Sequence, residues 1–294
     1  MSAQVAARPK GVSDRGFRLA PYLLTLPGVT WLFIFFLIPM VTMASVSLQE
    51  GSVERGFTLT WDWQNFSESF GRYDTQIFRS LIFGLVVTAA TLIISYPMAY
   101  WIAFRGGKRK NLYLLLILLP YFTPFLIRTL MWKQILADQG PFLAAFKSIG
   151  LLSEEFRVLA TPIAVVCGMI YNFLPFMALP LYVALERLDP ALLDAAADLY
   201  SSRREAFLKV TLPLSLPGVF AGSLLTFIPS VGDYIDAELL GGISETLVGN
   251  VIQRQFLTTL DYPSGAALSF MLMAGILLGV FLYARALGTE ELTG

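Results

Sequence analysis

Long stretches without a charged side chain are the feature that most limits how this chain can fold. Five cover residues 19–49, 80–104, 158–185, 210–232 and 262–284, and a shorter sixth, 111–127, continues past Arg128 through 129–132. A bilayer core of ~30 Å needs ~20 apolar residues in a helix, and a backbone in lipid must satisfy its own hydrogen bonds. The sequence therefore predicts an all-α polytopic membrane protein with six transmembrane helices.

Composition excludes most chemistry from this chain. Charged residues are 14% of the 294, against ~25% in soluble domains, and there is no histidine. The one cysteine, Cys167, lies in an apolar run, and no Gly-x4-Gly-Lys-Ser/Thr phosphate loop occurs. We expect no catalytic residue, metal site or cofactor. A net charge of zero without a basic run also argues against nucleic acid as a partner.

The distribution of basic residues predicts the orientation. With the N-terminus in the cytoplasm, 13 of the 21 Lys and Arg residues lie inside and 7 outside. We expect a cytoplasmic basic tail at 1–18, a transmembrane domain at 19–286 and a cytoplasmic tail at 287–294. A secretory signal peptide is the competing interpretation of the N-terminus, but the first apolar run exceeds the 7 to 15 residues of a signal core.

The loop between the fourth and fifth spans carries helix-capping signals. Asp189 before Pro190 is typical of a helix start, and Ser202 with Glu205 forms a capping box that starts a second helix. We expect Pro213 to end this second helix. Residues 189–213 therefore predict a helix-turn-helix at the inner membrane surface, the alternative being an ordinary connecting hairpin.

The same loop resembles the EAA loop of ABC importer permeases, with the pattern Glu-Ala-Ala, x3, Gly, x9, Ile-x-Leu-Pro. Four positions match by identity and two conservatively, whereas Tyr200 replaces the family glycine. The resemblance implies the type I importer permease fold and docking of a cytoplasmic ATPase. The docking residues it implies are Asp194, Ala195, Ala196, Tyr200, Val210, Leu212 and Pro213.

This family resemblance also implies the partners. They are two ATPase subunits that bind ATP and Mg, a second homologous permease, and an extracytoplasmic substrate-binding protein, assembled in the cytoplasmic membrane of a prokaryote. Residues 121–129, 231–242 and 261–269 are similar to the spermidine/putrescine branch, which implies a polyamine substrate. Another small polar solute, such as thiamine, stays open. An ion-coupled secondary transporter is the alternative mechanism, although no carboxylate lies in the middle of a predicted span.

Hydroxyl side chains form a stripe on the fifth predicted helix. Ser223, Thr226, Ser230 and Asp233 follow one another at helical spacing. The stripe either makes hydrogen bonds between helices or lines a translocation cavity, and its carboxylate end favours the cavity.

Acidic and aromatic residues follow this stripe. Asp233, Tyr234 and Asp236 are expected at the outer mouth, where carboxylates can pair with ammonium groups and a ring can hold an alkyl chain. A solvated outer loop is the alternative. Asn172, midway along the fourth span, suits an interhelical hydrogen bond or a substrate contact. Arg128 is expected ~25 Å from the inner end of a straight third helix, extending outward to pair with an outer carboxylate.

Overall fold

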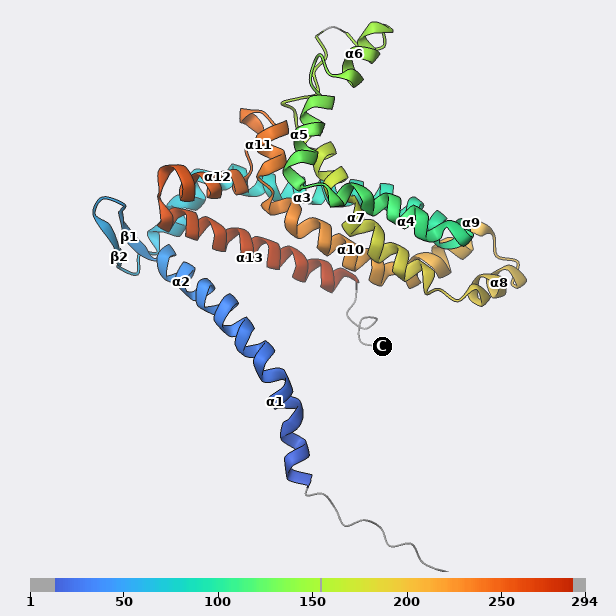
Figure 1. The fold of residues 1–294 in the computed structure, drawn as a ribbon, viewed down its shortest axis with the longest axis horizontal. Coiled ribbons are helices and arrows are strands. Elements are labelled where there is room, and N and C mark those ends of the chain that lie inside the picture. Colours follow the sequence, from blue (N-terminus) through green and yellow to red (C-terminus); the bar gives the residue numbers. More distant parts are fainter. Residues whose placement is uncertain (1–13, 154, 288–294) are drawn as a thin grey trace, which may run out of the picture.

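The computed structural model describes residues 14–153 and 155–287, and its body is a bundle of long helices. The main ones are α3 (Gln64–Arg105), α7 (Pro162–Glu186), α10 (Leu212–Gly232) and α13 (Tyr262–Leu287) (Figure 1). Within the described residues, five helices are long and apolar enough to cross a membrane, and a bent pair makes up to six. The expected all-α membrane fold is confirmed. One small addition is the antiparallel hairpin of β1 (Gln49–Ser52) and β2 (Gly56–Leu59).

The first span stands apart from the bundle. It consists of α1 (Asp14–Leu32), the π-helical turn η1 (Phe33–Leu37) and α2 (Ile38–Ser47), and only α2 packs against α13 (Figure 1). None of its apolar window is buried, so this surface is available to lipid or to another subunit. Of the tail expected at 1–18, residues 1–13 lie outside the described part, and 14–18 already belong to α1. Residues 288–294 of the expected C-terminal tail also lie outside it.

The central helices pack closely because small residues face one another. A side chain on Gly222 of α10 would meet the backbone oxygen of Met177 at 3.0 Å, and one on Gly218 would meet that of Pro180 at 2.8 Å. Both partners belong to α7. Membrane helices gain contact in this way, since lipid supplies little hydrophobic force between them. The α7 and α10 pair therefore forms a tight wall for the features described below.

The third span is broken rather than straight. It contains α4 (Lys110–Leu118), the 3₁₀ turn η3 (Leu119–Phe122) and α5 (Phe125–Ile135), and the two parts meet at 92°. Thr123 and Pro124 are extended, with ψ of 136° and 138°. Proline lacks an amide donor and disfavours helical geometry in the preceding residue. The prediction of one straight helix through Arg128 is therefore wrong.

Shorter elements connect the spans at both ends. At the end that the sequence predicts to face outward, called the outer side below and opposite to the inner side, are α6 (Pro141–Ser148), α11 (Ile235–Leu240), η5 (Ile243–Glu245), α12 (Val248–Arg254) and η6 (Gln255–Thr259). On the inner side are η2 (Gly107–Arg109), α8 (Pro190–Asp198), α9 (Arg203–Ala206) and the π-helical turn η4 (Phe207–Thr211).

Pro213 does not end the second inner helix, contrary to the prediction. α9, η4 and α10 form one helix from Arg203 to Gly232, 30 residues long. Pro213 lies at the start of α10, directly after the π-helical turn. A wider turn changes the hydrogen-bond register at the point where proline removes a donor, so the helix continues.

Candidate functional site: an inner helical loop and a buried polar cluster

The inner loop has the local structure that its capping residues predict. Asp189 Oδ1 accepts a hydrogen bond from the Ala191 amide at 2.9 Å and starts α8. The Ser202 hydroxyl accepts from the Glu205 amide at 3.3 Å, and Glu205 Oε2 accepts from the Ser202 amide at 3.0 Å. These two caps confirm the helix-turn-helix. It lies at one end of the bundle, with α8 at the tip (Figure 1).

Tyr200 adopts the backbone conformation that glycine would favour. Its φ is 58°, in the left-handed region. The Tyr200 amide donates to the Ala197 carbonyl at 2.9 Å and the Ser201 amide to the Ala196 carbonyl at 3.0 Å. This pair of bonds is the Schellman arrangement that closes a helix, normally on glycine. The loop therefore keeps the turn despite the substitution.

The implied docking residues divide into two groups. Asp194, Ala195 and Tyr200 are exposed on and after α8, beside Leu199, which is 82% exposed. Ala196 is half-buried against the rest of the loop. Val210, Leu212 and Pro213 are also half-buried, because they belong to the long helix that leads into the membrane. The surface that can meet another protein is thus α8 with its apolar end at Leu199 and Tyr200.

Changing Tyr200 to glycine is expected to stabilise this loop. An L side chain in the left-handed region costs about 1 kcal/mol, and part of the gain is offset by the greater freedom of glycine in the unfolded chain. We expect a net gain of about 0.5 kcal/mol, seen as a higher thermal midpoint of the purified protein. Tyr200→Ala is the matched control, because it removes the ring but keeps the strain. Equal midpoints for the glycine and alanine variants would contradict this account.

A buried polar cluster joins three helices on the opposite half of the molecule. Asp236 of α11 is 0% exposed. Its Oδ1 accepts hydrogen bonds from Thr129 Oγ1 of α5 at 2.7 Å and from Asn172 Nδ2 of α7 at 3.0 Å. Asn172 lies midway along α7, so Asp236 reaches well inside the bundle. The expectation that Asp236 lies at the outer mouth is therefore corrected.

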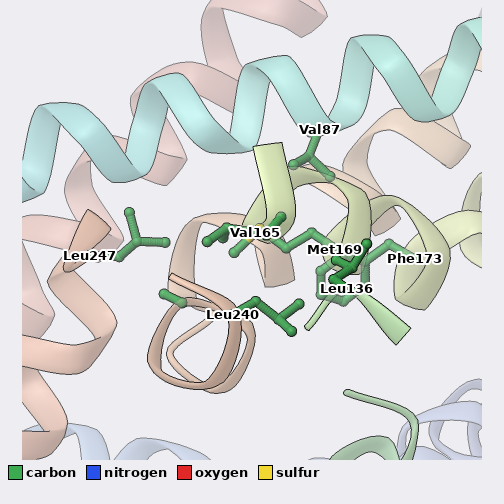
Figure 2. Packing of buried hydrophobic residues seen from close by; sticks show 9 residues of the cluster. Val87, Leu136, Val165, Met169, Phe173, Leu240 and Leu247 are labelled. Carbon is green, nitrogen blue, oxygen red and sulfur yellow. The ribbon is translucent and has the colours of Figure 1, made fainter. Parts of the chain in front are cut away.

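Local packing explains why α11 turns inward. The chain becomes extended at Asp233, whose Oδ1 accepts from the Asp236 amide at 2.9 Å and so caps the start of α11. Leu240 at the other end of α11 packs among Val165 and Met169 of α7, as Figure 2 shows. A side chain on Gly168 would overlap Leu240 and would stand 3.5 Å from Asp236 Oδ1. The absence of a side chain at Gly168 lets the two helices approach.

The two buried aspartates lie close enough to oppose each other's ionisation. Burial, reinforced by the neighbouring Asp236 carboxylate, raises the pKa of Asp233 to about 8. Two like charges in one low-dielectric site repel, so each carboxylate disfavours ionisation of the other. The hydrogen bonds that Asp236 accepts from Thr129 and Asn172 favour its charged form.

Arg128 of α5 supplies a positive charge beside this cluster. Its side chain is only 6% exposed, and its guanidinium carbon lies 5.2 Å from the ring centre of Tyr121 and 5.6 Å from that of Phe125. Its charge also acts electrostatically on Asp236. In the described ranges no carboxylate lies within 4 Å of Arg128. The expected outward extension and ion pair are therefore wrong, because the bend at Pro124 turns Arg128 into the protein.

Two hollows adjoin each other at Tyr121 and Phe176. One, about 420 Å³, is lined by Tyr121, Phe122, Thr123, Pro124, Phe125, Arg128, Asn172, Phe173, Phe176 and Pro229. A larger one, about 820 Å³, shares Tyr121 and Phe176 and extends between α7 and α10 to Arg187 and Leu188, next to α8. The Tyr121 and Phe176 rings touch edge to face, with centres 5.4 Å apart. The two hollows together therefore lie between the inner loop and Asn172 of the polar cluster.

The hydroxyl stripe of α10 does not line either of these two hollows. Ser223, Thr226 and Ser230 are buried inside the chain, and Ser230 Oγ donates to the Thr226 carbonyl at 2.6 Å. The side of α10 that lines the larger hollow carries Leu214, Pro217, Gly218, Ala221 and Leu225 instead. Tyr234 is partly exposed on the outer side, where its carbonyl and Glu238 both accept hydrogen bonds from Asn250.

Sequence reasoning missed the part played by Thr129 and by the aromatic rings around Arg128. Thr123-Pro124 was the available signal, since it marks a break that brings these residues together.

The family "Binding-protein-dependent transport system inner membrane component" matches residues 95–286, from the second half of α3 to α13. The chain belongs to this family. It is a permease subunit, as the inner loop indicated, and a multi-pass protein of the inner membrane. Its matched region contains both the loop and the buried cluster.

Similar proteins agree with this assignment. The spermidine/putrescine transport system permease protein PotB of Haemophilus influenzae is 39% identical over 260 residues, covering 87% of this chain and 90% of that protein. PotB of Escherichia coli K12 is 34% identical over 259 residues, covering 88% and 94%. A bacterial ABC transporter that imports alginate has a chain with a TM-score of 0.71 at 18% identity, covering 93% of this chain and 96% of that one. That likeness shows the fold alone, which is that of type I ABC importer permeases.

Proposed function

We propose that this permease carries a small organic cation, a polyamine such as spermidine or putrescine, into the cell in an ATP-driven importer. The observation that carries the proposal is the buried Asp236 carboxylate, whose hydrogen-bond partner Asn172 lines an aromatic hollow. A carboxylate attracts an ammonium group, and ring faces hold both ammonium groups and alkyl chains. The names of the PotB relatives support the same substrate class.

Partners would supply the energy and the substrate. Two ATPase subunits, which bind ATP and Mg, would receive α8 through the exposed Leu199 and Tyr200. A second, homologous permease would cover the groove between α7 and α10, and an extracytoplasmic binding protein would deliver the cation from outside. In this proposed assembly both chain termini would lie in the cytoplasm. The alginate transporter, described with a periplasmic protein bound, supports such an assembly in general.

Transport would follow from a change in helix packing. ATP binding has no direct contact with the membrane part, so it must act by favouring one of two arrangements of the permeases. The helix from Arg203 to Gly232 connects the inner loop to Asp233 without interruption. Movement of the loop would therefore reach the polar cluster, and the passage would open alternately to the two sides.

Uptake measurements test this function. The permease is expressed with the ATPase, second permease and binding protein that the proposal requires, in cells without polyamine import of their own. We expect saturable uptake of radiolabelled spermidine or putrescine that stops when the ATPase subunit cannot hydrolyse ATP. Preferential uptake of thiamine would overturn the substrate class. Polyamine uptake that persists with the inactive ATPase would instead favour an ion-coupled carrier.

A further inference from the structure

The wall of the smaller hollow includes a cation that belongs to the protein. The Arg128 guanidinium lies over two rings of its wall, Tyr121 and Phe125, at distances suited to cation–π attraction. Phe173 and Phe176 complete the aromatic wall. Such a site does not depend on the shape of a guanidinium, since any alkylammonium group is attracted by the same ring faces.

Two polar atoms at this hollow are buried without a hydrogen-bond partner. In the part of the chain that the structure describes, they are Arg128 Nε and Asn172 Oδ1. The Asn172 side chain is 1% exposed, and both residues line the hollow. Buried polar atoms normally have partners, so an unpaired acceptor at a hollow indicates a place for a donor. An ammonium group has three donors and no acceptor.

We propose that the smaller hollow is a binding subsite for one ammonium group of the transported cation, and that Arg128 occupies this place when the subsite is empty. The proposal rests on the proposed function and adds the position of the substrate to it. In the subsite, the ammonium group donates to Asn172 Oδ1, and the rings of Tyr121 and Phe125 receive its charge.

The charge balance explains why Arg128 and substrate would alternate. Arg128 is buried beside Asp236, and its positive charge already acts on that carboxylate in the empty state. A second buried cation beside Arg128 would be uncompensated, and an uncompensated buried charge is costly. Entry of the substrate therefore displaces the guanidinium, and return of the guanidinium displaces the substrate. Arg128 thus limits how long the cation stays.

Direct binding to the purified complex of both permeases and the ATPases, without the binding protein, tests this. We expect Arg128→Gln to bind spermidine about tenfold more tightly in equilibrium dialysis, since a desolvated cation–π competitor is worth about 1.4 kcal/mol or more. Adding Tyr121→Leu and Phe125→Leu is expected to remove this gain. The control is Arg72→Gln, because Arg72 also lies over a ring, that of Tyr73, but outside the hollow.

Each other outcome contradicts the proposal in a distinct way. A gain that survives the two leucine changes means that Arg128 only repels cations, and weaker binding by Arg128→Gln means that it holds the substrate or the fold. If the glutamine variant does not assemble, Arg128→Met supplies the neutral side chain, and the same gain is required. Uptake by the wild-type protein tests the proposed function separately. If the wild type takes up polyamine but the Arg128 variants do not bind spermidine more tightly, the subsite is rejected and the proposed function stands.

Discussion

Replacing Leu199 by aspartate is expected to abolish capture of the ATPase subunits and, with it, transport. Leu199 is 82% exposed at the end of α8, so the change leaves the folded permease itself almost untouched. In the proposed complex the side chain would be buried against the ATPase. Burying a charge there without a partner costs more than about 3 kcal/mol, which is over a hundredfold in affinity.

Copurification from detergent measures this effect directly. We expect the Leu199→Asp permease to reach the membrane at the normal level but to lose the ATPase during purification, with polyamine uptake falling to background. Ile243→Asp is the matched control, because Ile243 is 98% exposed in the outer turn η5. That variant should retain its ATPase. A Leu199→Asp complex as stable as the wild type would show that α8 does not dock the ATPase through this residue.

Replacing Asp236 by leucine is expected to cause the largest loss of stability among the single changes considered. The side chains are similar in size, but leucine accepts no hydrogen bond, so Thr129 and Asn172 lose their partner. Arg128 would also keep a buried charge without its counter-charge. Removing one partner from a buried charged cluster typically costs about 3–5 kcal/mol. We expect low yield, a clearly lower thermal midpoint and no transport.

Asp236→Asn separates charge from shape. Asparagine still accepts a hydrogen bond, so we expect this variant to fold and assemble, but with spermidine uptake reduced at least tenfold because the negative charge is gone. Glu238→Gln is the control, since Glu238 pairs with Asn250 on the outer side and not with the cluster. Normal uptake by Asp236→Asn would show that its charge is not needed for transport.

Features that depend on neighbouring residues could be predicted from the sequence. The apolar runs gave the spans, because the membrane requires a minimum helix length. Asp189 and Ser202 gave the two inner helix starts, because caps act within three residues of the chain. The Tyr200 turn is an intermediate case: glycine is preferred there, but the two Schellman bonds hold the same geometry on tyrosine.

Features that depend on contacts between distant segments could not be predicted from the sequence. The depth of Asp236 is set by Leu240 packing on α7 and by the space at Gly168, which no local pattern reveals. The hydroxyl stripe of α10 had the right period for a polar face, but periodicity does not say which neighbour that face meets. The direction of Arg128 likewise depends on the size of the bend after η3, which is a property of the packed bundle.

The continuous helix from Arg203 to Gly232 couples movements at the two ends of the bundle. At 1.5 Å per residue its 30 residues extend over about 45 Å. A tilt of about 10° around its middle would move each end by about 4 Å in opposite directions, which is more than a hydrogen bond can stretch. Asp233 lies directly after its outer end and caps α11. A movement of the inner loop would thus displace Asp233 and the start of α11, the helix that carries Asp236.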